Sequence, residues 1–157
     1  MEKVIEKPSA DKILSLIPQQ SPFRFIDELT FIDENRSEGS YTFKKDEYFY
    51  KGHFPDMPVT PGVILTECMA QIGLVALGLY LIGGDEESTK DSKTLFTSSY
   101  VDFKKMVLPG DKVIVKSEKK YFRFKKLCCN VRMETPEGNL ICSGELSGMF
   151  EIGRAHV

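Results

Sequence analysis

The pattern of apolar and polar positions predicts a long buried helix. Residues 62–82 (GVILTECMAQIGLVALGLYLI) are apolar on nearly every side, with Glu67 and Gln71 in the middle. At ~1.5 Å per residue this stretch would be about 30 Å long, which also fits a membrane span. An acid in the middle of a bilayer costs about 3 kcal/mol, and the rest of the chain offers amphipathic strands that need a helix to cover. We therefore expect the core helix of a folded domain, without a membrane.

The remaining pattern predicts one antiparallel sheet around that helix. Residues 10–17 form a short amphipathic helix, residues 44–61 form a structured loop, and the acidic run after residue 84 forms an exposed loop. Turn residues mark 35–39, 109–111 and 136–139, the last as a hairpin. Strands are expected at 23–33, 39–43, 94–105, 112–122, 123–135 and 139–150. This order predicts an α+β fold in which the sheet wraps around the long helix.

Composition limits the classes of protein. The 157 residues carry a net charge of −2, so no overall basic excess points to nucleic acid. The N-terminus is charged and has no apolar export signal. Four cysteines occur without a CxxC pair, which favours buried, reduced thiols in a cytoplasmic protein over a metal site. We expect one domain over 1–150; the tail 151–157 (EIGRAHV) resembles translated sequencing adapter and is expected to be non-native, which leaves His53 as the native histidine.

Candidate catalytic residues lie close together in the sequence where the long helix begins. His53 lies in a loop stiffened by three prolines, and the first free helix amides are those of Gly62 and Val63. Glu67 follows in the helix, and Gln71 lies four residues later, where it can hydrogen-bond the Glu67 carboxylate. A histidine base, a buried acid of raised pKa and amides for an oxyanion would together remove a proton alpha to a carbonyl and protonate a leaving hydroxyl.

Each of these features also has a plain structural explanation. A lone loop histidine is more often a packing or surface residue, a lone glutamate in an apolar helix is more often a satisfied structural acid, and Gly and Pro before a helix are usually a turn and a cap. The residue types alone therefore leave the catalytic and the structural interpretation both open.

The segment HFPDMPVTPGV, followed by Glu67 and Gln71, closely resembles the 3-hydroxyacyl-[acyl-carrier-protein] dehydratases (FabZ/FabA-like) of type II fatty acid synthesis. The segments PFRFIDELTFID, DEYFYKGHF and FKKMVLPGDKV extend this resemblance over most of residues 20–150. The resemblance implies a hotdog fold and dehydration of 3-hydroxyacyl thioesters to trans-2-enoyl thioesters, without metal or cofactor. It also implies a homodimer that can assemble to a hexamer, an acyl tunnel, and sites shared between two chains, with the histidine from one and the acid from the other.

The same resemblance assigns roles by position. His53 would be the base that takes the alpha proton, and Glu67 would deliver a proton to the beta hydroxyl. Gly62, with Val63 beside it, would offer an amide to the thioester carbonyl. Val59 would hold His53 through its carbonyl, and Gln71 would orient Glu67. An acid that is Glu rather than Asp is typical of the branch that only dehydrates, whereas Asp56 departs from the usual Gly of that branch.

The implied partner is acyl carrier protein, which is acidic and would contact a basic rim. Lys104, Lys105 and Arg123 are the candidates for this rim, although lysines that alternate along a strand are usually only its solvated face. Two other functions stay open beside the dehydratase: a hotdog thioesterase, and a non-catalytic acyl-binding partner subunit of a polyene or polyketide pathway.

Overall fold

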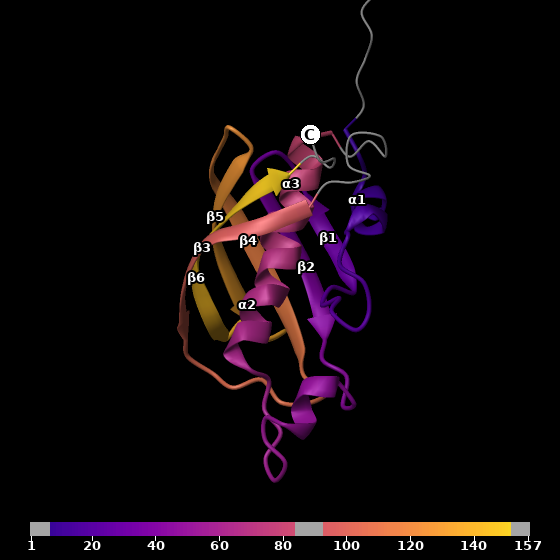
Figure 1. Ribbon diagram of the computed structural model, residues 1–157, viewed down its shortest axis with the longest axis vertical. Coiled ribbons are helices and arrows are strands. Elements are labelled where there is room, and N and C mark those ends of the chain that lie inside the picture. Colours follow the sequence, from indigo (N-terminus) through magenta and orange to yellow (C-terminus); the bar gives the residue numbers. More distant parts are fainter. Residues whose placement is uncertain (1–6, 84–92, 152–157) are drawn as a thin grey trace, which may run out of the picture.

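A six-stranded antiparallel sheet curls around one central helix. The computed structural model describes residues 7–83 and 93–151, and Figure 1 shows the helix running along the sheet. The strand order is β1-β2-β4-β5-β6-β3, and every pair is antiparallel. The strands are β1 Glu28–Ile32, β2 Arg36–Thr42, β3 Lys93–Phe103, β4 Lys112–Arg123, β5 Lys126–Glu134 and β6 Leu140–Glu151. The predicted α+β hotdog architecture is confirmed.

The central helix is continuous but not uniform. It consists of α2 (Gly62–Ala70), a π-helical turn η2 (Gln71–Val75) and α3 (Ala76–Leu81). The segment Gly62–Leu81 is long and apolar enough to cross a membrane, with a mean hydropathy of 1.8, yet 78% of it is buried inside the fold. The predicted helix is therefore confirmed as the core of the domain. The apolar pattern of residues 62–82 does not predict the π-helical turn.

The core forms where the helix meets the inner face of the sheet. In β4, Val113 and Val115 are fully buried while Lys112 and Lys116 are exposed, as the alternation predicts. The short helix α1 (Ala10–Leu16) is capped by the Ser9 hydroxyl, which accepts the Lys12 amide. All four cysteines are free and buried, as expected.

The N-terminal strand is shorter than its sequence suggests. We predicted a strand over 23–33, but β1 begins only at Glu28. The backbone of Phe23 and Phe25 bonds instead to the side-chain amide of Gln71, which occupies groups that a neighbouring strand would need. The turn predicted at 35–39 is also wrong in extent. The Asp33 carboxylate accepts the amides of Asn35 and Arg36, so the turn closes early and β2 starts at Arg36.

The hairpin between β4 and β5 has a turn without turn residues. Phe124 and Lys125 both have positive φ, 52° and 61°, between the paired residues Arg123 and Lys126. Two-residue hairpin turns favour positive φ at both central residues, a conformation that the pair Asn-Gly adopts most readily. Because no Gly, Asn or Pro marks this position, the sequence predicts that the strand starts at residue 123, whereas β5 starts at Lys126. The β5–β6 hairpin at 136–139 is confirmed.

Candidate functional site

The loop that carries His53 is a hydrogen-bonded unit projecting beyond the end of the sheet. It follows the short 3-10 helix η1 (Tyr48–Lys51) and leads into α2 (Figure 1). Phe54 and Met57 exchange backbone hydrogen bonds, and the Thr60 amide donates to the Val107 carbonyl at 2.8 Å. The hydroxyls of Tyr50 and Thr60 lie 2.6 Å apart in the buried base of the loop. These contacts hold the loop against η1 and against the segment that follows β3.

The imidazole of His53 is oriented by Val59. Nδ1 of His53 lies 2.9 Å from the Val59 carbonyl oxygen, and the Val59 amide donates back to the His53 carbonyl at 2.9 Å. A carbonyl oxygen can only accept, so Nδ1 carries the proton. In the neutral ring Nε2 then holds a free lone pair, as a general base requires. The Phe54 ring stacks on the imidazole, with centroids 4.2 Å apart.

The start of α2 presents two unused amides. Pro61 caps the helix, and its carbonyl accepts the amides of Ile64 and Leu65. Within residues 7–83 and 93–151, the amides of Gly62 and Val63 have no hydrogen-bond acceptor. Such amides, together with the positive end of the helix dipole, favour a developing negative charge. A Cβ at Gly62 would lie 3.1 Å from the ring of Phe103, so only glycine fits this approach without movement.

Glu67 lies about one turn further along α2 and is half-buried. Gln71 donates from Nε2 to Glu67 Oε2 at 2.9 Å and to the Phe23 carbonyl at 2.9 Å. Its Oε1 accepts the Phe25 amide at 2.7 Å, and the residue is fully buried. Burial raises the pKa of the Glu67 carboxyl above its usual value, while the hydrogen bond from Gln71 opposes part of that rise. The carboxyl is thus held in one direction and favoured in its protonated form.

The structure brings together some of the predicted residues and separates others. Val59 and Gly62 line a pocket of about 360 Å³ with Phe103, Lys104 and Lys105. Among the described residues, His53 and Glu67 of one chain make no hydrogen bond to each other. The contact between Phe103 and Gly62 was not foreseen, because the two residues are distant in sequence and no pattern connects them.

The three basic candidates do not form one patch on a single chain. The Lys104 amide donates a hydrogen bond to the Ile141 carbonyl on β6. In the sheet register Arg123 lies opposite Lys126, and Lys126 lies opposite Met149 on β6. Ile141 and Met149 lie eight positions apart along β6, or about 25 Å. Arg123 also stacks over Tyr121, 4.4 Å from the ring centroid. Lys104 and Lys105 therefore border the pocket at Gly62, and Arg123 lies at the opposite end of the sheet.

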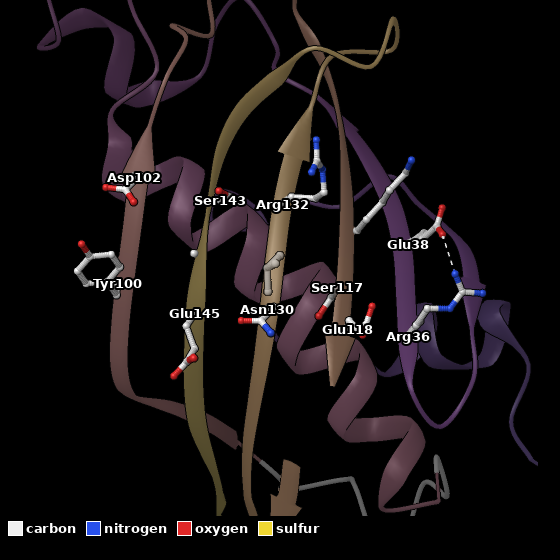
Figure 2. A pocket seen from close by; sticks show the side chains of 13 residues that line it. Arg36, Glu38, Tyr100, Asp102, Ser117, Glu118, Asn130, Arg132, Ser143 and Glu145 are labelled. Atoms are coloured by element: carbon white, nitrogen blue, oxygen red, sulfur yellow. Dashed lines mark ion pairs between the residues drawn. The ribbon is translucent and has the colours of Figure 1, made fainter. Parts of the chain in front are cut away.

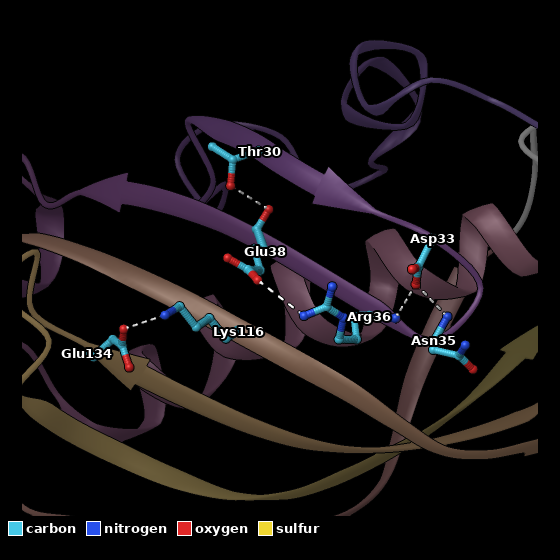
Figure 3. A network of polar contacts seen from close by, with 7 residues as sticks. All are labelled: Thr30, Asp33, Asn35, Arg36, Glu38, Lys116 and Glu134. Carbon is cyan, nitrogen blue, oxygen red and sulfur yellow. Dashed lines mark hydrogen bonds and ion pairs between the residues drawn. The ribbon is translucent and has the colours of Figure 1, made fainter.

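A hollow of about 610 Å³ lies on the outer face of the sheet and contains no candidate residue. Figure 2 shows its charged side chains on the strands, with the helix behind them. Lys116 and Arg132, which line the hollow, bind Glu134 at 2.8 Å and 3.0 Å. Figure 3 shows the Lys116–Glu134 pair near Arg36 and Glu38. Opposite charges neutralise each other on this face, which is typical of a solvated sheet surface. No cluster of metal-binding side chains occurs within the described residues.

Comparisons with known proteins show the fold class and the family of this chain. An antiparallel sheet curled around one central helix places the chain in the hotdog-fold class. The FabA-like domain model matches residues 17–144. A 3-hydroxyacyl-[acyl-carrier-protein] dehydratase FabZ from Caldicellulosiruptor bescii is 36% identical over 139 residues, 87% of this chain and 94% of that protein. The FabZ of Bacillus licheniformis is 33% identical, over 92% of this chain and 95% of that one. The chain belongs to the 3-hydroxyacyl-[acyl-carrier-protein] dehydratase family.

Solved structures confirm the fold. A thioesterase from Haemophilus influenzae superposes with a TM-score of 0.68 at 14% identity, over 97% of this chain and 96% of that one. The dehydratase heterocomplex ApeI:P from Xenorhabdus doucetiae gives a TM-score of 0.68 at 16% identity, over 88% and 90%. At such identities the likeness concerns the hotdog fold alone.

Proposed function

We propose that this protein dehydrates 3-hydroxyacyl thioesters on acyl carrier protein to trans-2-enoyl thioesters, in fatty acid or related acyl-chain biosynthesis. Its family and the names of its relatives support this reaction. The observation that carries the proposal is the bond from His53 Nδ1 to the Val59 carbonyl, because it leaves Nε2 as a proton acceptor.

His53 begins the reaction. Nε2 accepts a proton from the carbon alpha to the thioester carbonyl, and the electron pair of that C–H bond forms the Cα=Cβ double bond. The amides of Gly62 and Val63 hydrogen-bond the thioester oxygen, on which negative charge develops as the proton leaves. These amides are available for that purpose because the described part of the chain provides no other acceptor for them.

Glu67 completes the elimination. Its carboxylic acid donates a proton to the beta hydroxyl, the Cβ–O bond breaks, and water leaves with the electron pair of that bond. This step needs a protonated acid, which partial burial of Glu67 favours. Gln71 keeps Oε2 in a fixed position through its 2.9 Å hydrogen bond. The proton held by His53 then returns to Glu67 through solvent, and the enzyme is regenerated.

We infer a homodimer in which His53 of one chain serves the same reaction as Glu67 of the other. Apolar surface near the proposed site supports assembly, because large exposed patches usually mark interfaces. Among the described residues, β3 is an edge strand whose outer side has no partner strand, and edges of this length are usually covered. Exposed apolar side chains occur on β3 and around the histidine loop: Leu95, Phe96, Tyr100, Phe103, Phe54, Met57, Val63 and Met106. Association of such dimers to a hexamer is the further state we propose.

Acyl carrier protein would dock where Lys104 and Lys105 border the pocket at Gly62. Both lysines are exposed, so their ammonium groups can meet an acidic partner. Arg123 would contribute only if assembly brings the far end of another sheet to the same entrance. We place the reaction in the cytoplasm, a reducing compartment suited to four free thiols.

The test is turnover of a 3-hydroxyacyl thioester on acyl carrier protein, followed by conjugated-enoyl absorbance. Wild type should form enoyl product, and His53→Ala and Glu67→Gln should lose at least about a hundredfold in kcat while remaining folded. Glu118→Gln, an exposed acid in β4, is the matched control and should keep full turnover. Near-normal turnover in both site variants would refute the assigned roles. Release of free thiol in place of enoyl product would indicate a thioesterase.

A further inference from the structure

The π-helical turn lies directly behind the proposed acid. It spans Gln71–Val75, and the Ala76 amide donates to the Gln71 carbonyl five residues earlier. A π turn contains one residue more than an α turn, and such turns occur frequently at functional sites. Gln71, the residue that holds Glu67, is the first residue of the turn.

Two serines of the sheet bind this turn. The Ser37 hydroxyl on β2 donates to the Ile72 carbonyl at 2.9 Å, and the Ser117 hydroxyl on β4 donates to the Gly73 carbonyl at 2.8 Å. Ser37 and Ser117 are direct partners in the β2–β4 register. Both serines are buried. If either hydroxyl were removed, the carbonyl that it binds would lose its hydrogen bond where water does not readily replace it, which is unfavourable.

Small residues allow the close approach that these bonds require. A Cβ at Gly73 would lie 2.9 Å from Cβ of Ser117 and 3.0 Å from Cγ1 of Val131. A Cβ at Gly39 would lie 3.0 Å from Cγ2 of Ile72. The helix therefore lies close to the sheet at the π turn, and the serine pair lies at that contact.

We propose that Ser37 and Ser117 are positioning residues, which hold the π turn and thereby the direction of the Glu67 carboxyl. One residue more in a turn rotates the preceding helix by about 100° relative to a regular α-helix. If the turn relaxed to α geometry, α2 would rotate relative to α3 and the sheet. The Glu67 side chain would then point in a different direction, and Gln71 would leave the backbone of Phe23 and Phe25. This inference rests on the proposed function for the role of Glu67, but not for the geometry of the turn.

The experiment compares Ser37→Ala, Ser117→Ala and their combination with Ser40→Ala. Ser40 is a suitable control because it is 3% exposed on the same strand, and alternation places it on the face away from the helix. We expect each serine variant to lower kcat about tenfold and the double variant more, with KM changed less than about threefold. Exchange of the Ala76 amide should accelerate in the same variants. Ser37→Thr, which keeps a hydroxyl, should restore turnover above that of Ser37→Ala, and Ser40→Ala should resemble wild type.

A second measurement does not depend on turnover. The side-chain amide of Gln71, followed by ¹⁵N NMR, should exchange slowly in wild type and Ser40→Ala and lose this protection in the double variant. Retained protection of Gln71, or full kcat despite faster Ala76 exchange, would overturn the positioning role. A general loss of stability with no selective change at Ala76 and Gln71 would assign the serines to packing alone. If wild type forms no enoyl product, the proposed function fails, while the Gln71 signals still decide whether the serines position Glu67.

Discussion

Gln71 donates a hydrogen bond to Glu67 across one turn of the central helix, with 2.9 Å between Nε2 and Oε2. The same buried side chain also binds the Phe23 carbonyl and the Phe25 amide. One glutamine therefore joins the proposed acid to the segment before β1. Gln71 is therefore both part of the proposed site and a buried residue of the core.

Replacement of Gln71 by leucine should affect both properties. Gln71→Leu leaves the buried Phe25 amide without an acceptor, which should lower the free energy of unfolding by about 2–3 kcal/mol. The variant should also lose turnover, because the Glu67 carboxyl is no longer held. Urea unfolding and enoyl formation measure the two effects. Gln20→Leu, at an exposed glutamine before β1, is the control for the substitution, and an unchanged stability of Gln71→Leu would contradict the assigned hydrogen bonds.

The raised pKa of Glu67 predicts a pH dependence of stability. The folded state binds the proton of Glu67 more tightly than the unfolded state, so this proton favours folding at low pH. That contribution is fully present below the unfolded pKa and is lost as pH rises through the folded pKa. Glu67→Gln should therefore become more stable relative to wild type as pH increases from 4 to 8. Unfolding of both proteins at several pH values checks this, and a difference that is constant or shrinks with pH would exclude the raised pKa.

Gly78 is a position where the core admits no side chain. A Cβ there would lie 1.6 Å from Cζ of the buried Phe150 ring, in the middle of the packed helix–sheet contact. Gly78→Ala should therefore destabilise the protein by about 3 kcal/mol, measured by thermal or urea unfolding. Gly52→Ala is the matched control, since its Cβ meets nothing within 4 Å, and it should change stability by less than about 0.5 kcal/mol. Equal stability of the two variants would mean that Phe150 does not pack as described.

A substitution in the hairpin turn at Phe124–Lys125 should increase the stability of the protein. Lys125 has a φ of 61°, a conformation that glycine adopts without the steric penalty of a side chain. Lys125→Gly should stabilise the protein by about 1 kcal/mol. Lys126→Gly, one position later in β5, should do the opposite, because glycine inside a strand loses more conformational entropy. Unfolding curves that show the same sign for both variants would contradict the turn geometry.

Much of the fold could be predicted from one-dimensional patterns. The long apolar run at 62–82 predicted the central helix, and alternating residues such as Val113 and Val115 predicted the half-buried strands. One error occurs where the partner is distant in sequence. The segment 23–27 alternates like a strand, but its backbone binds Gln71, 46 residues away from Phe25. Residues 84–92, where an exposed acidic loop was predicted, lie outside the described residues, as do the last six positions of the tail predicted at 151–157.

For this protein, the sequence by itself determined the periodicity of the elements and the order of chemical groups near the start of the central helix, because both depend on residues close together in the chain. Only the tertiary structure decided how far Glu67 is buried, which raises its pKa, and the separation of Arg123 from Lys104. It also decided the π turn beneath Ser37 and Ser117. These properties depend on which distant groups share a hydrogen bond or exclude water, and such contacts exist only once the sheet has closed around the helix.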